Sequence, residues 1–437
     1  MRQRKPTHHS RLARHVGVMR RRLAISALSL TLGILLACVV PALAAWRARD
    51  GIVARNVPSV QADGGAPNLA YVAGAGADGQ GLAVIDINQR GETRYLAVGG
   101  TPAGVVLSQD SRYAFVSRRA RDQIAVVDTS SLRVLRTIPV GRRPTALAYD
   151  VNQSLLYVAN SGSNTVSVVN PATFTVTHVI AVGAAPSGLA IAAANSGITA
   201  YDDEELYVAN AGDASISIYS IRRQRVIATI PLPSDPAAVV IPSVGGVAYV
   251  TTSAGAVLAL SLSAHRLLGV LWQSAGARLG VMDYDAVTGV IYVPDASANT
   301  VVALTPAGDS GNQPPRFPSE PARTLTFAGT PVSVAITFEG AYGFVAERDA
   351  GRVAMFDATT RQTLGVVAVG GAPVAIVTGA YPPLLTQQGA TLADALGAGA
   401  ILLIMLAALT SLLVEIRRQR RRRSARTTSE RIKGSAS

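Results

Sequence analysis

Residues that commonly take part in metal or acid–base chemistry are sparse in this chain of 437 residues, which has five histidines and one cysteine. His8, His9 and His15 lie in a basic N-terminal stretch, which leaves only His178 and His265 for the rest of the chain. Zinc, copper and haem sites need several His or Cys side chains that converge. We therefore predict that the chain holds no such cofactor and that both remaining histidines are solvated strand residues.

Carboxylates are the other candidates for such chemistry. Asp283 stands in the middle of a short apolar stretch, GVMDYD, so its side chain is expected on a strand rather than in a turn. Asp150 and Asp285 occupy equivalent strand ends, where aspartate ordinarily closes a turn. A hard-cation site needs about six or more oxygen ligands. One mid-strand carboxylate therefore predicts neither a metal site nor a catalytic set.

Two stretches are longer than a strand-and-turn pattern requires. The first, residues 194–204, leads into an acidic run, and the second, residues 305–323, is rich in proline. The acidic run consists of Asp202, Asp203, Glu204 and Glu205. Because binding residues concentrate on loops held by a rigid scaffold, the acidic run is a candidate partner-binding loop. The interpretation that we favour is that both stretches are ordinary solvated spacers.

The elements that position these residues repeat along the chain. Seven times a Tyr or Phe is followed by Val or a similar residue in a short apolar run, at spacings of 44, 42, 50, 42, 43 and 52 residues. These anchors are Tyr71, Phe115, Tyr157, Tyr207, Tyr249, Tyr292 and Phe344. A period of about 40 to 50 residues built from short strands is typical of a β-propeller. We predict an all-β fold, a seven-bladed propeller of four-stranded antiparallel blades.

The unit from Pro144 to Gly183 shows the pattern most clearly, as PTALAYD, SLLYVAN, NTVSVVN and VTHVIAVG. Each piece is rich in β-branched and aromatic residues and is bounded by turn residues. Several hinges between units read VG-x-x-P, at residues 98–102, 140–144, 182–186 and 369–373, or FAGTP at 327–331. Gly is expected to allow a sharp turn there. Residues 374–379 are expected to supply the inner strand of the blade begun by residues 69–98, which would close the ring.

The stretch LYVAN-x-x-x-NTVSVVN, followed by VIAVGAAPSGLAI, resembles the YVTN-type β-propeller repeat, which also occurs in surface-layer-like propeller proteins. A second close copy is ELYVANAGDASISIYS at residues 205–220, with Asn210 in the place of Asn160. Ser117 is assigned to the same place in the second blade. The resemblance covers residues 67–379 and implies the propeller fold. It implies no particular activity, because proteins with unlike roles share the repeat.

Two apolar runs flank the repeats, residues 23–45 and residues 392–414. Each exceeds the ~20 residues that a helix needs to cross a ~30 Å bilayer core. Eight Lys or Arg residues precede the first run and nine follow the second. Because positive charges stay on the cytoplasmic side, we predict two transmembrane helices in the cytoplasmic (inner) membrane, with the propeller on the extracytoplasmic face and both termini cytoplasmic. The predicted cytoplasmic tails are residues 1–22 and 415–437, and the predicted linkers are residues 46–66 and 380–391.

The two tails account for the formal net charge of +13. They carry +8 and +7, so the residues between them carry about −2. We therefore expect the tails to meet anionic lipid and expect no nucleic-acid partner. The first apolar run has two alternatives to a retained helix: a signal peptide cleaved near Ala45, or a lipid anchor at Cys38. Cys38 is the only cysteine, which excludes an intramolecular disulfide.

Taken together, these patterns favour a non-enzymatic binding or scaffold module for a protein or cell-envelope ligand, without a cofactor and without catalytic residues. The alternative is a propeller enzyme of the lactonase or quinoprotein type, with Asp283 as the carboxylate at the central channel. A third possibility is that the propeller transmits an outside signal to the basic tails.

Overall fold

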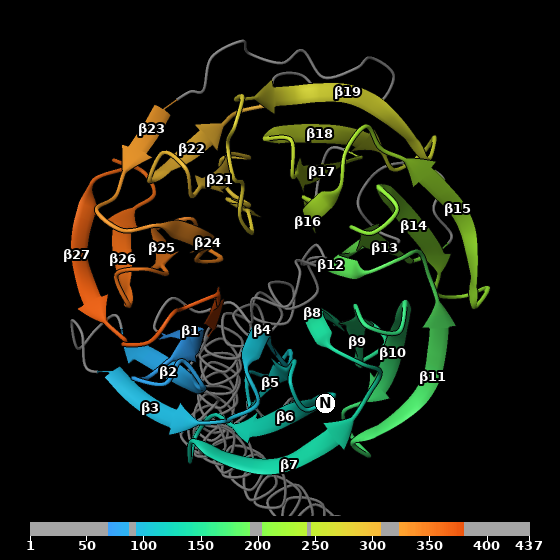
Figure 1. Cartoon of the computed structure of the whole chain (residues 1–437), viewed down its shortest axis with the longest axis horizontal. Helices are drawn as coiled ribbons and strands as arrows, with labels where there is room; N and C mark the ends of the chain where they lie inside the picture. Colours follow the sequence, from blue (N-terminus) through green and yellow to red (C-terminus); the bar gives the residue numbers. More distant parts are fainter. Residues whose placement is uncertain (1–68, 87–92, 193–202, 243–245, 307–322, 380–437) are drawn as a thin grey trace, which may run out of the picture. The chain divides into compact units, whose positions relative to one another are not determined.

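The computed structural model describes residues 69–86, 93–192, 203–242, 246–306 and 323–379. Over these ranges the chain forms seven four-stranded antiparallel sheets arranged as blades around a central opening (Figure 1). This confirms the predicted all-β, seven-bladed propeller. No helix within the described ranges is long and apolar enough to cross a membrane. The predicted spans 23–45 and 392–414, with their linkers and tails, lie outside these ranges.

Each blade runs from an inner strand at the opening to an outer strand at the rim. Blade 1 consists of β28 (Ala375–Gly379), β1 (Leu69–Ala75), β2 (Gly81–Asp86) and β3 (Thr93–Ala97). Blade 2 consists of β4 (Pro102–Leu107), β5 (Tyr113–Arg118), β6 (Gln123–Asp128) and β7 (Arg133–Pro139). Blade 3 consists of β8 (Pro144–Asp150), β9 (Leu155–Asn160), β10 (Thr165–Asn170) and β11 (Thr175–Ala181). Blade 4 consists of β12 (Pro186–Ala192), β13 (Glu205–Asn210), β14 (Ser215–Ser220) and β15 (Arg225–Pro231).

The remaining blades follow the same order. Blade 5 consists of β16 (Pro236–Val240), β17 (Val247–Thr252), β18 (Ala256–Ser261) and β19 (Arg266–Gln273). Blade 6 consists of β20 (Asp283–Tyr284), β21 (Ile291–Asp295), β22 (Thr300–Leu304) and β23 (Arg323–Thr326). Blade 7 consists of β24 (Pro331–Ile336), β25 (Tyr342–Glu347), β26 (Arg352–Asp357) and β27 (Thr363–Ala368).

The ring closes within blade 1, where β28 pairs antiparallel with β1 as predicted. Leu69 lies opposite Gly379, and Tyr71 lies opposite Val377. The first and last described residues therefore meet at one end of the blade. We call the side on which they lie the chain-end face. The opposite side, which carries the hinges between blades and the loops between second and third strands, is the hinge face.

The seven anchors lie on the second strands and are buried, with at most 4% of their surface exposed. The apolar core of the described residues divides into seven clusters, one at each interface between neighbouring blades, and each cluster contains one anchor. Phe344 of blade 7, for example, packs with Ala70 and Val72 of blade 1. The repeat period thus records the packing of each blade on the next.

The hinge glycines allow a sharp turn at some hinges, as expected from sequence, and close packing at others. Gly141 and Gly183 do not have positive φ values, although Gly99 and Gly370 do. A Cβ on Gly141 would lie 2.7 Å from Cβ of Asn160, which is buried directly beneath it. Real Cβ atoms do not approach so closely, so only glycine fits at this hinge.

The pairing register corrects one residue assignment. Pro144 lies opposite Asn160 in blade 3, and Pro102 lies opposite Arg118 in blade 2. The second-blade equivalent of Asn160 is therefore Arg118, not Ser117. Ser117 instead points to the neighbouring blade, where its hydroxyl donates to the carbonyl of Thr145 at 2.7 Å. An arginine thus stands at the hinge face where the close repeat copies carry asparagine.

The first prediction concerns this packing. We expect Gly141→Ala to lower the free energy of unfolding by about 1–3 kcal/mol, because the new methyl group overpacks the buried Asn160 side chain. Thermal unfolding of the purified chain should show a lower midpoint. Gly365→Ala is the matched control, since its Cβ would meet no atom within 4 Å, and it should be neutral. Equal midpoints for both variants would contradict the packing argument.

Candidate functional site

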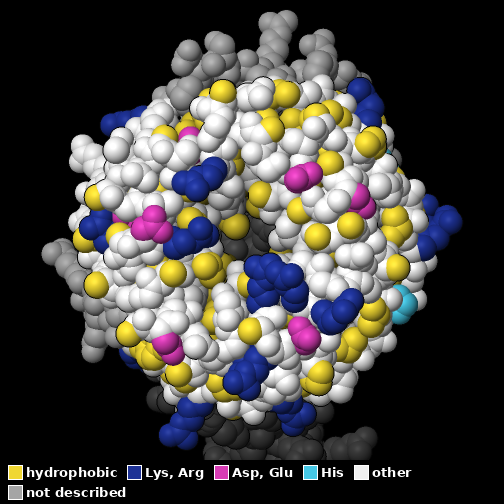
Figure 2. Space-filling view, in the orientation of Figure 1, with side chains coloured by type: hydrophobic (Ala, Val, Ile, Leu, Met, Phe, Trp, Pro, Cys, Tyr) yellow, Lys and Arg dark blue, Asp and Glu magenta, His cyan; other side chains and the backbone are white. Residues whose placement is uncertain are grey.

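The central opening widens on the hinge face into a cavity of about 360 Å³, which we call the mouth cavity. Its apolar wall includes Ala237, Val281, Val332 and Val374 from inner strands and the residues next to them. Its polar groups are Arg278, Thr330, Arg348 and Asp349, from hinges and loops of blades 6 and 7. Figure 2 shows the opening at the centre of this face. The cavity combines apolar side chains with charged and other polar groups, and its exposed lining is more polar than apolar.

Blade 6 shapes the mouth cavity because its inner strand leans on blade 7. The Val281 N–H donates to the Val332 carbonyl at 2.9 Å, and the Val334 N–H donates to the Val281 carbonyl at 3.1 Å. This parallel bridge lies outside the regular four-stranded pattern. Gly280 permits it, because a Cβ there would lie 2.2 Å from the Val332 oxygen.

The two arginines of the mouth cavity are exposed, and neither takes part in the ion pairs found among the described residues. Asp349 accepts a hydrogen bond from the Thr330 hydroxyl at 2.5 Å, and the Arg348 N–H donates to the Thr330 carbonyl at 2.9 Å. A guanidinium binds carboxylate or phosphate in a bidentate manner. The mouth cavity therefore suits an anionic group of a ligand.

Asp283 lies below this cavity rather than in its wall. Its Oδ1 accepts the Tyr284 N–H and its Oδ2 accepts the Ile336 N–H, both at 2.8 Å. Burial raises the pKa of Asp283 to about 6, although both hydrogen bonds act in the opposite direction. Because Ile336 belongs to blade 7, the carboxylate links two inner strands. Both carboxylate oxygens of Asp283 therefore accept hydrogen bonds from backbone N–H groups.

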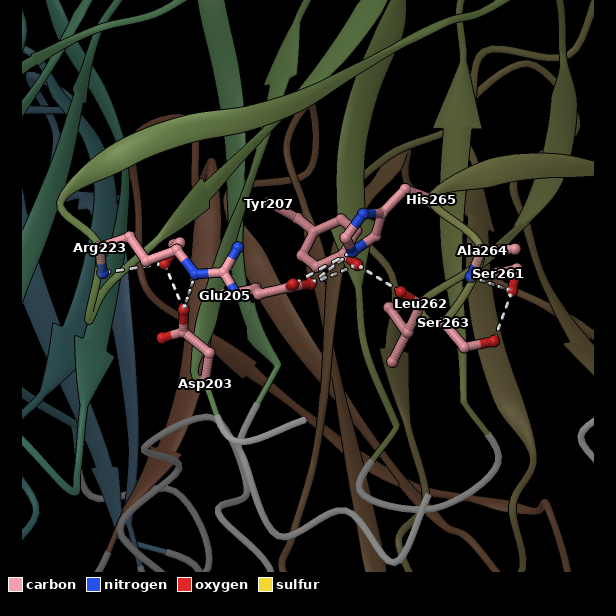
Figure 3. Close-up of polar contacts among 10 residues, drawn as sticks. Asp203, Glu205, Tyr207, Arg223, Ser261, Leu262, Ser263, Ala264 and His265 are labelled. Carbon is pink, nitrogen blue, oxygen red and sulfur yellow. Dashed lines mark hydrogen bonds and ion pairs between the residues drawn. The ribbon is translucent and has the colours of Figure 1, made fainter. Parts of the chain in front are cut away.

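The acidic run lies on the chain-end side of blade 4 (Figure 3). Asp202 falls outside the described residues. The other three are buried, with Asp203 and Glu204 8% exposed and Glu205 3% exposed. The partner-binding role stays a prediction, but these three side chains are directed to partners within the propeller.

Each of the three acids has a different partner. Glu205 accepts the Tyr207 hydroxyl at 3.0 Å and contacts His265 Nε2 of blade 5 at 2.9 Å (Figure 3). Glu204 accepts hydrogen bonds from Asn152 and Gln153 in the β8–β9 turn of blade 3. Asp203 accepts the Arg222 N–H and lies 3.8 Å from the Arg223 guanidinium within blade 4. The acidic run therefore ties blade 4 to both neighbours.

The two histidines differ from one another. His178 is exposed on β11, as expected for a solvated strand residue. His265 is not such a residue, because its ring is half-buried against Glu205. No group of three or more His, Cys, Asp or Glu side chains that could hold a metal ion occurs within the described ranges.

Asp150 and Asp285 both close turns, as their strand-end positions predict. Asp285 Oδ1 accepts the Val287 and Thr288 N–H groups, and Asp150 Oδ1 accepts those of Asn152 and Gln153. Asp150 Oδ2 is buried and has no hydrogen-bond partner in the described structure. Burial raises the pKa of Asp150 to about 6, and the nearby Glu204 carboxylate adds to this.

Comparisons with known proteins agree with the fold. A family model described as a seven-bladed β-propeller lactonase matches residues 86–178, and no curated protein matches the chain in sequence. Because that model describes a lactonase propeller, the finer YVTN-type assignment stays a prediction.

Solved structures are similar at low identity. The periplasmic gluconolactonase PpgL of Pseudomonas aeruginosa is 18% identical, with a TM-score of 0.55 over 71% of this chain and 98% of that one. Hydrazine synthase of Kuenenia stuttgartiensis is 19% identical, with a TM-score of 0.53 over 64% and 89%. A functionally unknown protein of Desulfotomaculum acetoxidans is 11% identical, with a TM-score of 0.59 over 72% and 100%. These similarities show the shared fold alone.

The mouth arginines were not among the candidates from sequence. A signal for Arg278 exists, because the hinge of blade 6 reads SAGARLG and has arginine where other hinges have proline. Arg348 has no such signal. It reaches the mouth cavity only because the β25–β26 loop lies beside the hinge that contains Thr330.

The second prediction uses Asp150. A carboxyl whose pKa is raised in the folded state opposes folding while it is ionised in both states, and this penalty disappears as pH falls through about 6 toward 4. We expect Asp150→Asn to raise the free energy of unfolding at pH 7.5, on the order of 1–3 kcal/mol, since asparagine keeps the turn bonds and removes the buried charge.

This gain should shrink when denaturant unfolding is repeated at pH 4.5, where Asp150 is protonated in the folded state. Glu339→Gln is the control, because Glu339 is exposed and its loss should change little at either pH. A variant that is less stable at pH 7.5, or a difference independent of pH, would rule out this account of Asp150.

Proposed function

We propose that the chain is a membrane-anchored, extracytoplasmic binding module that takes an anionic group of its ligand, a protein or cell-envelope component, at the mouth cavity. The observation that carries this proposal is the pair Arg278 and Arg348 beside an apolar wall, both outside the ion pairs of the described residues. A guanidinium forms strong, charge-assisted hydrogen bonds to carboxylate or phosphate.

The chain ends support the orientation that we propose. Leu69 and Gly379 lie side by side at the chain-end face, so two membrane spans at residues 23–45 and 392–414 would hold that face toward the bilayer. The hinge face, with the mouth cavity, would then face away from the membrane and meet ligands there. Basic tails on the cytoplasmic side fit the same arrangement.

A lactonase-type enzyme is the second candidate, and it is favoured by the lactonase family model and by the fold of the gluconolactonase PpgL. In this case Asp349 would take a proton from the attacking water. Arg278 and Arg348 would stabilise the oxyanion that forms on the carbonyl oxygen when water attacks the lactone carbonyl carbon. The ring C–O bond would then break, and Asp349 would pass the proton it has taken to the departing ring oxygen, which gives a hydroxy acid. Asp283 is not assigned a role, because its oxygens are held by backbone N–H groups.

The third prediction tests the mouth cavity. Calorimetric titration of the full chain in detergent with hexanoate and hexyl phosphate should show binding that hexanol, the neutral analogue, does not share. The double variant Arg278→Gln/Arg348→Gln should weaken anion binding at least tenfold, about 1.4 kcal/mol, because both charged donors are lost. Arg133→Gln/Arg266→Gln removes the same charge elsewhere and should bind as the parent does.

Equal affinity of hexanol and hexanoate would overturn the anion site. Hydrolysis of gluconolactone, followed by pH-stat against the uncatalysed rate, separates the two candidate functions. Acceleration that Asp349→Asn abolishes while hexanoate binding persists would establish the enzyme instead of the binding module.

The fourth prediction concerns topology. In a Cys38→Ser background, Ser163→Cys on the hinge face should react with a membrane-impermeant maleimide in spheroplasts, whereas Ser429→Cys in the C-terminal tail should react only after lysis. The reason is that the two positions are expected on opposite sides of the membrane. Labelling of Ser429→Cys but not Ser163→Cys in unbroken spheroplasts would place the propeller in the cytoplasm and contradict the proposal.

A further inference from the structure

Five arginines lie together on the hinge face, on two adjacent loops of blades 2 and 3. We call this group the arginine sector. It comprises Arg118, Arg119, Arg121, Arg142 and Arg143. The first three belong to the end of β5 and the β5–β6 loop, and the last two belong to the hinge between β7 and β8. Figure 2 shows Lys and Arg side chains gathered on one side of the central opening.

Hydrogen bonds from backbone N–H groups hold the two loops of the arginine sector side by side. The Arg143 N–H donates to Asp122 Oδ1 at 2.8 Å, and the Val140 N–H donates to the Asp122 carbonyl at 3.0 Å. The next loop is attached in turn, since the Gly162 N–H donates to the Arg142 carbonyl at 2.9 Å. The sector is therefore a surface fixed by the propeller frame rather than a pair of independent loops.

The charges of this sector are not balanced within the propeller. Asp122 is the only acidic residue of the two loops, and its Oδ1 accepts a backbone N–H. None of the ion pairs among the described residues includes a sector arginine. Arg118 is half-buried and donates to the Gly99 carbonyl and to Gln123. Its pKa is lowered by burial and by the positive charge of Arg121, as expected where like charges are crowded.

Acidic side chains also occur on the hinge face, on blades 4 and 5 beyond the arginine sector. The β13–β14 loop of blade 4 carries Asp213, and the hinge before β16 of blade 5 carries Asp235, and neither loop contains an arginine. In Figure 2 acidic side chains are scattered over this face, and one lies beside the gathered arginines. The hinge face therefore bears charges of both signs and concentrates five arginines in one sector, although the charges outside the two tails sum to about −2.

We propose that the arginine sector binds an acidic polysaccharide, a chain whose sugar units carry carboxylate or phosphate groups. The site is separate from the mouth cavity and does not depend on a ligand there. Planar guanidinium groups on a fixed surface match repeating carboxylates or phosphates. The cations of the described residues other than histidine are all arginines, because the two lysines, Lys5 and Lys433, lie outside those ranges.

Other polyanions fit the arginine sector less well. A protein interface needs large apolar or aromatic anchors, and none of the exposed large hydrophobic side chains lies on these loops. Single-stranded nucleic acid needs aromatic side chains for base stacking, and these loops have none. Anionic lipid is disfavoured by the proposed topology, because the sector lies on the face opposite the chain ends.

The fifth prediction tests the sector with the full chain in detergent micelles and fluorescent oligogalacturonate of about ten units. The parent should bind it, and the affinity should fall as NaCl rises, because binding releases counterions. Arg121→Gln/Arg142→Gln/Arg143→Gln should weaken binding at least tenfold at 100 mM NaCl and flatten the salt dependence. The three side chains are exposed, so the melting temperature should stay the same and show that the fold is intact.

Three control variants test whether binding depends on the position and geometry of the sector arginines. Arg133→Gln/Arg225→Gln/Arg266→Gln removes the same charge at the rim and the chain-end side and should bind as the parent does. Changing Arg121, Arg142 and Arg143 to Lys should give intermediate affinity, since charge is kept and bidentate geometry is lost. Arg278→Gln/Arg348→Gln should leave polymer binding unchanged, so failure at the mouth cavity and failure at the sector are distinguishable.

Four outcomes would overturn the proposal. These are equal binding by the triple Gln variant, equal binding of neutral dextran, tighter binding of poly-glutamate than of oligogalacturonate, and displacement of the polymer by phosphatidylglycerol vesicles at lower anion concentration than oligogalacturonate itself. The last two would assign the sector to an acidic protein or to a lipid surface.

Discussion

The structure depends on the inability of a four-stranded sheet to bury both of its faces alone. Each blade therefore packs an aromatic anchor from its second strand against the next blade, and seven such interfaces close on themselves. Because the interfaces are alike, a break in the ring between any two blades would expose two apolar sheet faces and a strand edge. Pairing of β28 with β1 removes that opening, and the positions of hinges, loops and mouth cavity follow from it.

Polar side chains also form hydrogen bonds between neighbouring blades, beside this apolar packing. Glu205 reaches His265 in blade 5, Glu204 reaches the β8–β9 turn of blade 3, and Asp283 accepts an N–H group of blade 7. All three are buried acceptors satisfied across a blade interface, where removal of one partner would leave an unpaired polar group. Such links fix the angle between neighbouring blades, and so they help to hold the loops of the hinge face at set positions.

The sequence predicted the architecture well because the anchor period is a direct record of blade packing. It predicted side-chain neighbours poorly, because these depend on contacts distant in sequence. The acidic run resembles a solvated loop in composition, yet Glu204 and Glu205 meet residues about 50 and 60 positions away. Arg118 was missed through a register error of one residue. The arginine sector was missed because the near-neutral sum outside the tails hides a local group of like charges.

Closure by β28 has a consequence for biogenesis. The strand that completes blade 1 is the last of the described strands to be synthesised, so until residue 379 is available the first sheet has three strands and an unpaired inner edge. Exposed edges of this kind favour wrong pairing and aggregation. Any passage of the chain across a bilayer would extend that vulnerable interval. The protein therefore reaches its native form only after the whole domain has emerged, and a chain truncated before β28 would be a target for quality-control proteases.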